Sequence, residues 1–302
     1  MLTGKPGVLN IDKPRGLTSH DVVARVRRLT GIRRVGHAGT LDPLATGVLL
    51  VCVGRATRIV EYLQQGQKVY ETTVRLGQET DTYDAEGEIV SQKDAPDFSL
   101  EALEQALDAF RGDILQTPPM YSAIKKDGQP LYKLARAGKV VKRSPRPVHI
   151  EEIEILEWRH PDLSLRITCS PGVYIRSIAH DLGRALGVGG HVLNLRRIAS
   201  GSWRVEDAVT LETLEAAGED WPRYLHGLRA ALAMLPTLVL SRELAYRFAL
   251  GQHIELAQPP ITNADLRVLG PGERFIGIGR IKDDVLSPHK VFGDPLKFKP
   301  PV

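Results

Sequence analysis

A single carboxylate in a glycine-bounded segment is the strongest chemical signal in the sequence. Asp42 lies between Gly36 and Gly47, directly before an apolar run. A lone carboxylate can act as a nucleophile that forms a covalent intermediate with its substrate. The segment lacks the Gly-Lys-Ser/Thr ending of a P-loop, and no second carboxylate is spaced for glycosidase chemistry. Asp42-Pro43 also suits an ordinary turn, and the residue types alone favour that structural role.

Basic side chains are concentrated in one stretch of the chain. The protein has 302 residues and a modest net charge of +4. The stretch from Lys125 to Arg146 is strongly basic, and Asp127 is its only acidic residue. Such a stretch repels itself unless solvent or a polyanion neutralises it. The composition therefore indicates either a solvated loop or a nucleic-acid contact.

The sequence contains no pattern for a metal site, a disulfide or a membrane span. Cys52 and Cys169 both lie in apolar runs, which is typical of buried thiols in a reducing compartment. The histidines show no metal-ligand spacing, and the N-terminus lacks the residue order of a signal peptide. No apolar stretch approaches the roughly 18 residues of a membrane helix. We therefore expect a cytoplasmic protein that needs no metal.

The elements around Asp42 are predicted from hydrophobic periodicity. The continuous apolar run Val48 to Val53 predicts a central strand buried on both faces. Residues 70–76 alternate between apolar and polar side chains, which predicts a second strand. Ser19 is predicted to cap a helix that ends at Gly31. Between them, the segment from Gly36 to Gly47 is predicted to be a loop.

The order of the remaining elements indicates the fold class. Strands outnumber helices and come in hairpin-like pairs, such as 150–158 with 163–169, which predicts an α+β fold on a mixed or antiparallel sheet. After Pro236, short strands punctuated by glycine predict a small β domain. We therefore expect two domains, 1–232 and 235–302. Residues 118–147 are expected to form an excursion with some order of its own.

Five short motifs together resemble the pseudouridine synthases of the TruB type. They occur in the family's order and at its spacing across residues 1–232, and the combination is far more specific than any one motif. The resemblance implies a pseudouridine-synthase fold with a central mixed or antiparallel sheet, and a PUA-like RNA-binding domain at the C-terminus. The motifs are the catalytic loop 37–47, the KPxGxTS segment 13–19, the tyrosine strand 68–71, the arginine motif 172–177 and the leucine motif 195–197.

The resemblance implies a catalytic set of three residues. Asp42 would be the nucleophile, and it would attack either the uracil ring or the sugar. Arg176 would hold that carboxylate in one orientation and keep it ionised. Tyr70 would stack on the flipped base and assist proton transfer at C5.

The resemblance also implies residues that bind the substrate. Tyr70, Tyr174 and Leu195 would line the uracil pocket. His37 would support the rearranged RNA loop where the base has left, which offsets part of the unstacking cost.

The implied activity is isomerisation of uridine 55 in the T loop of tRNA to pseudouridine. The reaction is redox-neutral, so no cofactor is expected. The basic residues 118–147 would grip the T arm through phosphate contacts. The expected protein is a monomer that requires no protein partner. Two alternatives remain open: a guide-RNA-dependent enzyme acting on ribosomal RNA, whose family members lack the basic insertion, and a tRNA-folding chaperone that needs no turnover.

Overall fold

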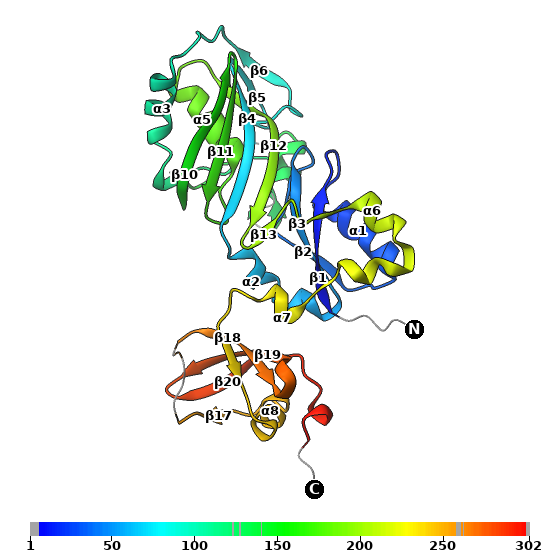
Figure 1. Ribbon diagram of the computed structural model, residues 1–302. Coiled ribbons are helices and arrows are strands. Elements are labelled where there is room, and N and C mark those ends of the chain that lie inside the picture. The colour runs from blue at the N-terminus through cyan, green and yellow to red at the C-terminus, as the bar shows by residue number, and fades with distance from the viewer. Residues whose placement is uncertain are drawn as a thin grey trace.

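Two main β-sheets of unequal size follow one another in the sequence of the protein chain, and two short hairpins accompany them (Figure 1). The computed structural model describes residues 6–122, 124–126, 128–139, 141–257, 261 and 263–299. The large sheet contains strands from Gly7 to Gly227, and the small sheet contains strands from Thr237 to Val291.

The large sheet has eleven strands and is mixed. Its main path runs β14-β1-β3-β12-β4-β11-β10-β7, with β2 beside β3, β13 beside β12 and β15 beside β1. The pairs β1–β14 and β12–β3 are parallel, and the other pairs are antiparallel. This confirms the predicted α+β class. The strands are β1 (Gly7–Lys13), β2 (Val35–Ala38), β3 (Thr46–Val53), β4 (Lys68–Leu76), β7 (Gly112–Gln116), β10 (Arg146–Arg159), β11 (Asp162–Cys169), β12 (Gly190–Ser200), β13 (Trp203–Arg204), β14 (Val209–Thr210) and β15 (His226–Gly227).

Strand β3 is buried on both faces, as its continuous apolar run predicts. Leu49 and Val51 pack into the main core of the large sheet. Leu50 and Cys52 point to the opposite face and pack into a second core. Because neighbouring residues of a strand point to opposite faces, only an unbroken apolar run fills both cores.

Helices cover the large sheet at both ends (Figure 1). Helices α3 and α5 lie beside β10 and β12, whereas α1 and α6 lie near β2 and β1. The helices of this part are α1 (Ser19–Thr30), α2 (Val60–Gln64), α3 (Leu100–Asp108), α5 (Ile175–Ala185), α6 (Leu211–Ala216) and α7 (Leu228–Ala231), with 3₁₀ turns at Gly54–Ile59 and Gly218–Tyr224.

The predicted N-cap of α1 is wrong by one residue. Thr18, not Ser19, caps the helix, because its hydroxyl accepts from the backbone N–H of Asp21 while the Asp21 carboxylate accepts from Thr18 N–H. This reciprocal pair satisfies two otherwise unpaired donors at the helix start. Ser19 is instead buried, and its hydroxyl bonds the backbone of Leu41. Its polar side chain therefore positions the catalytic-motif loop.

The predicted loop from Gly36 to Gly47 is shorter than expected. Its first residues belong to β2, which pairs antiparallel with β3 between Val35 and Ala38. The irregular part is confined to residues 39–45. Strand alternation is hard to recognise over four residues, two of which are small, and this explains the error.

The small sheet is joined to the large one through side chains and a shared core. Tyr62 on α2 donates to the Asp265 carboxylate at 3.0 Å, and Ile278 and Phe292 pack in the second core of the large sheet. The predicted boundary at 232–235 remains a prediction, and the change of sheet between α7 and β16 supports it. The elements are β16 (Thr237–Val239), α8 (Arg242–Ala249), β17 (Ile254–Glu255), β18 (Asp265–Gly270), β19 (Arg274–Lys282) and β20 (Val285–Val291).

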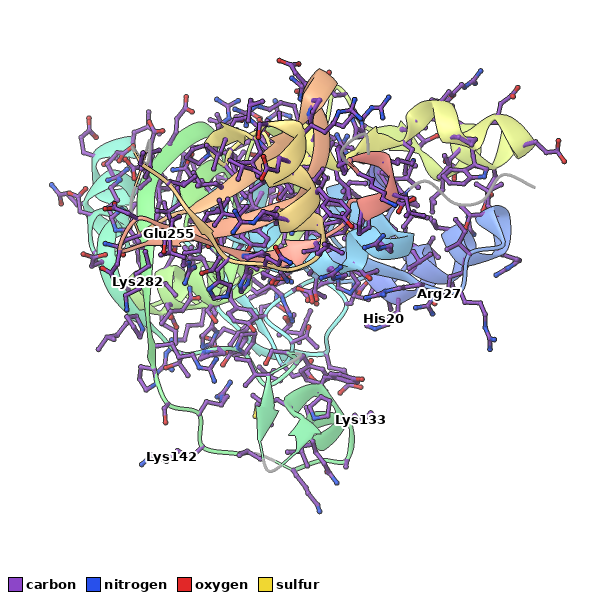
Figure 2. All side chains as sticks on the ribbon, turned by 90° about the horizontal axis from the view of Figure 1, so that it is seen from below. His20, Arg27, Lys133, Lys142, Glu255 and Lys282 are labelled. Carbon is purple, nitrogen blue, oxygen red and sulfur yellow. The ribbon has the colours of Figure 1, made fainter. Side chains whose placement is uncertain are left out.

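The basic segment forms a small ordered excursion. It contains the short hairpin β8 (Lys125–Lys126) and β9 (Gln129–Pro130), followed by helix α4 (Leu131–Arg136). Figure 2 shows Lys133 and Lys142 on this part, which extends away from the body of the molecule.

A second hairpin, β5 (Gln78–Thr80) with β6 (Ile89–Gln92), follows β4. Within the described residues, every helix is too short or too polar to cross a bilayer.

We predict that Gly47→Ala destabilises the protein far more than Gly16→Ala. Both glycines have a positive φ, 97° and 86° respectively, so either alanine adds about 1–2 kcal/mol of backbone strain. A Cβ at Gly47 would also overlap the carbonyl oxygen of Arg197, whereas a Cβ at Gly16 would meet open space. Overpacking of this kind adds about 1–3 kcal/mol. Urea unfolding of the two variants measures the difference, and equal losses of stability would contradict the prediction.

Candidate active site

The loop that carries Asp42 is held in place by hydrogen bonds from one neighbouring segment and by two buried leucines. From the KPxGxTS segment, Gly16 N–H donates to the Pro43 carbonyl at 2.8 Å, and the Lys13 ammonium reaches the same oxygen at 3.3 Å. Leu41 and Leu44 anchor the loop in the core with exposures of 4% and 2%. The Ala45 N–H closes a turn on the Asp42 carbonyl. Asp42 therefore does lie in a turn, as its sequence suggests, but only its backbone carbonyl takes part in the hydrogen bond that closes the turn. Its carboxylate is left for other contacts.

The carboxylate of Asp42 forms an ion pair with Arg176. Their closest atoms, Oδ2 and Nη2, are 2.9 Å apart. Arg176 is only 4% exposed, whereas 35% of the Asp42 side chain is accessible. The guanidinium also donates to the carbonyl oxygens of Thr82 at 3.0 Å and Tyr121 at 2.7 Å. Arg176 is therefore held rigidly, and Asp42 presents its free edge to the cavity.

A second carboxylate, Asp84, completes this cluster, and the sequence analysis missed it. Its Oδ2 lies 3.2 Å from Nη1 of Arg176. Its other oxygen, Oδ1, accepts from the Thr82 hydroxyl at 2.6 Å and from Glu86 N–H at 3.1 Å. Asp84 follows Asp81 in a short polar turn between β5 and β6, and no residue pattern marks one aspartate rather than the other as buried.

Five of the six predicted site residues line one cavity of about 330 Å³. This volume lies at the lower end of the range for small-molecule sites. The chain brings them together from the catalytic-motif loop, from β4 and β12 in the middle of the sheet, and from the start of α5. The five are Asp42, Tyr70, Tyr174, Arg176 and Leu195.

Tyr70 and Arg197 form a buried polar pair on one wall of this cavity. Tyr70 is 9% exposed and Arg197 is 2% exposed, and the two residues are paired directly across β4 and β12. Burial raises the pKa of the Tyr70 phenol, so the ring is a neutral stacking surface with one polar atom. Arg197 also donates to the carbonyls of Val48 at 2.8 Å and Gly39 at 3.2 Å. It therefore ties the leucine motif to the Asp42 loop.

Tyr174 and Leu195 contribute to the walls in different ways. Gln116 fixes the backbone of Tyr174, since its amide oxygen accepts from Tyr174 N–H at 2.7 Å and its amide nitrogen donates to Tyr174 O at 3.0 Å. Ser122, at the root of the basic excursion, lines the same cavity as Tyr174. Leu195 is 7% exposed and offers an apolar surface.

His37 is the one predicted site residue outside the cavity lining. It lies on β2, edge-on to the ring of His20 with centroids 5.3 Å apart, and its Nδ1 is buried without a partner among the described residues. Burial and the nearby His20 lower the pKa of His37 below its ordinary value. The imidazole is therefore neutral at pH 7. Its expected role in supporting a rearranged RNA loop remains a prediction.

Burial and the ion pair act in opposite directions on Asp42. Burial is the larger effect and raises the pKa of Asp42 above its ordinary value, while Arg176 lowers it and the like charge of Asp84 raises it further. Ionised Asp42 is therefore basic and poorly solvated, as suits a nucleophile. Among the residues that the structure describes, no group of three or more His, Cys, Asp and Glu side chains is placed to hold a metal ion.

Sequence comparisons with known proteins give matches along nearly the whole chain. Residues 27–175 match the TruB family pseudouridylate synthase (N terminal domain), and residues 176–238 and 236–292 match two TruB C-terminal domains. The protein named tRNA pseudouridine synthase B from Pseudomonas aeruginosa (strain UCBPP-PA14) is 47% identical to this chain over 92% of each chain. The protein of the same name from Burkholderia pseudomallei (strain 668) is 42% identical to this chain, over 94% of this chain and 96% of the relative.

Solved structures share the whole fold. The matching chain in the crystal structure of a Cbf5-Nop10-Gar1 complex is 27% identical, with a TM-score of 0.75 over 97% of this chain and 86% of that chain. The matching chain in an H/ACA RNP bound to a substrate RNA containing 2'-deoxyuridine is 25% identical, with a TM-score of 0.74 over 97% and 87%. From its sequence matches and its fold, the chain belongs to the TruB family of pseudouridylate synthases.

Proposed function

We propose that this enzyme isomerises uridine 55 in the T loop of tRNA to pseudouridine, with Asp42 as the nucleophile. The observation that carries the proposal is the 2.9 Å ion pair between Asp42 and Arg176, placed in a cavity that Tyr70 also lines. The relatives named tRNA pseudouridine synthase B, which match nearly the full length of the chain, support tRNA as the substrate class.

The proposed mechanism uses the cavity for a base that has left the RNA stack. Flipping costs a few kcal/mol and brings the uracil between Tyr70 and the apolar wall. Asp42 forms a bond to the sugar or to the uracil ring, the N1–C1′ bond breaks, and the ring turns so that C5 bonds to C1′. The bond to Asp42 breaks as the C5–C1′ bond forms or after it, and this regenerates the carboxylate. C5 then loses a proton and N1 gains one, so no electrons enter or leave. Arg176 keeps Asp42 ionised and aimed at the nucleotide throughout.

The basic excursion supports an RNA substrate. Lys133, Lys139 and Lys142 have exposed side chains there. At its root, Ser122 lines the cavity and the Tyr121 carbonyl accepts a hydrogen bond from Arg176. Phosphate contacts at the excursion would orient the RNA arm while the flipped base enters beside the same root. The proposal requires no protein partner.

The guide-RNA-dependent alternative has a specific observation in its favour, since the solved structures with this fold include an H/ACA RNP and a Cbf5 complex. Those chains are 25–27% identical to this one, however, whereas the tRNA-named relatives are 42–47% identical over comparable lengths. The basic excursion further favours direct recognition of tRNA. We therefore retain tRNA as the proposed substrate.

We predict that Asp42→Asn binds unmodified tRNA with nearly unchanged affinity but makes pseudouridine more slowly by on the order of 10⁴-fold or more. The amide keeps the shape of the side chain but cannot act as a nucleophile. Site-by-site mapping of pseudouridine in the tRNA after incubation measures this and tests position 55. Asp162→Asn is the matched control, because Asp162 also pairs with an arginine, at 2.8 Å from Arg75, but lies outside the cavity. Product formed by Asp42→Asn at the rate of the control would remove Asp42 from the mechanism.

We predict that two substitutions shift the pH profile of kcat/KM in opposite directions. Asp42 must be ionised to attack, so activity appears as pH rises through its pKa. Arg176→Gln removes the cation that lowers this pKa, so the acidic limb should move to higher pH. Asp84→Asn removes a negative charge that raises it, so the limb should move to lower pH. Shifts of the same sign in both variants would show that another group controls the limb.

We predict that replacing Lys133, Lys139 and Lys142 together by Gln flattens the salt dependence of tRNA binding. Each lost phosphate contact lowers the slope of log K against log salt by about 0.9 or less. Arg143, although equally basic, donates to the Pro118 carbonyl at 3.0 Å, so it is left intact. Arg159→Gln with Lys93→Gln is the control, because Arg159 lies at the other end of β10 from the excursion. Filter binding from low to high salt gives the slope for the wild type, the lysine variant and the control. A slope of the lysine variant equal to that of the wild type would exclude the excursion from the RNA contact.

A further inference from the structure

Lys68 is a buried cation on the wall of the catalytic cavity, and none of the roles assigned above uses it. It begins β4, two residues before Tyr70, so both side chains point to the same face of the sheet. Its side chain is among those that line the cavity with Asp42. Lys68 is only 5% exposed. A lysine is rarely buried to this extent unless it is paired or functional.

The ammonium of Lys68 has few acceptors in the free protein. Nζ donates to the hydroxyl of Ser200 at 2.9 Å and lies 3.5 Å from the carbonyl oxygen of Leu63, which is a long contact. An ammonium carries three N–H donors, so at least one has no acceptor within the described part of the chain. Lys68 also makes no ion pair with any described carboxylate.

The other cations near Asp42 have carboxylate partners or several carbonyl acceptors, and Lys68 has neither. Arg176 contacts two carboxylates, and Arg197 donates to backbone carbonyls of the catalytic loop. Lys13 is equally buried, but its Nζ contacts three backbone carbonyl oxygens at 2.6–3.3 Å, and it does not line the cavity. Lys13 therefore has a complete structural role, whereas Lys68 brings an unneutralised positive charge to the cavity wall.

Such a charge costs free energy in the empty enzyme. Burial, with a smaller contribution from Arg197, lowers the pKa of Lys68 to about 8, so the group is still mostly protonated at pH 7. An uncompensated buried ammonium destabilises the folded state unless a ligand supplies the missing negative charge. The reaction itself generates such a charge. When the N1–C1′ bond breaks, its electron pair stays on the uracil ring and spreads to the two carbonyl oxygens.

We propose that Lys68 is a further catalytic residue, whose ammonium donates a hydrogen bond to a uracil carbonyl oxygen and stabilises the ring while it is detached from the ribose. The negative charge disappears when C5 shares an electron pair with C1′ and passes its proton to solvent or a base, and N1 takes up a proton. Lys68 remains protonated throughout. The interaction is stronger with the detached ring than with bound uridine, so it accelerates the reaction. The inference rests on the proposed function of this cavity.

The test compares Lys68→Met and Lys68→Gln with wild type in single-turnover reactions on unmodified tRNA. Both variants should lower the rate constant by about 10²-fold or more, with tRNA affinity close to wild type and a melting temperature no lower than that of wild type, because the uncompensated buried charge is gone. Gln keeps an N–H donor but carries no charge, so near-normal activity of Lys68→Gln would show that the positive charge is not needed and would overturn the proposal. Lys93→Met, at an exposed lysine, controls for the loss of one positive charge.

Modified substrates locate the contact. A tRNA with 2-thiouridine or 4-thiouridine at the target position replaces one carbonyl oxygen by sulfur, a weaker acceptor. One of the two substrates should slow the wild type more than it slows Lys68→Met. The variant has no ammonium at this position, so weakening the acceptor on the uracil costs it nothing there. Equal slowing of both enzymes by both substrates would overturn the proposal. If wild-type enzyme forms no pseudouridine in tRNA, the proposed function fails instead. If wild type is active and Lys68→Met matches it, only the role of Lys68 fails.

Discussion

The ion pair between Asp42 and Arg176 is the constraint on which the rest of the site depends. A carboxylate in a cavity is costly to ionise, and a guanidinium at 2.9 Å offsets that cost while fixing the direction of the oxygen atoms. Arg176 in turn needs its other donors satisfied. Asp84 and two backbone carbonyls do this, and the arginine can therefore hold Asp42 without rotating. The catalytic geometry is thus set by a residue that is itself almost inaccessible.

The mixed sheet explains how residues distant in sequence reach one cavity. Strand β12 pairs parallel with the start of β3 at Thr46 and Gly47, and antiparallel with β4 along most of its length. The end of the catalytic loop, Tyr70 and Leu195 are therefore neighbours across three adjacent strands. Only glycine fits at position 47, because the backbone of Arg197 passes too close for a side chain. Gly47, at the end of the motif, is therefore required for β3 and β12 to pack this closely.

Hydrophobic periodicity predicted most of the fold, and the resemblance to the TruB-type synthases implied the five cavity residues, while the errors came from interactions that local sequence does not encode. The buried strand β3 was predicted from its continuous apolar run, and strand β4 was predicted from its alternation of apolar and polar residues. Each pattern is typical of a strand and of little else. Asp84 and Lys68 were missed because their burial depends on β12, α5 and the end of α2, which are remote in sequence. The choice of Thr18 over Ser19 as helix cap likewise depends on Leu41, which claims the Ser19 hydroxyl.

The basic excursion and Arg176 belong to one hydrogen-bonded unit. Arg176 donates to the Tyr121 carbonyl at 2.7 Å, and the next residue of α5, Ser177, donates to the Thr117 carbonyl at 2.8 Å. Gln116, at the end of β7, fixes the backbone of Tyr174 from the same side. A displacement of the excursion root therefore moves the acceptors that orient Arg176, and with it Asp42. The basic surface of the excursion and the guanidinium that orients Asp42 therefore cannot be positioned independently.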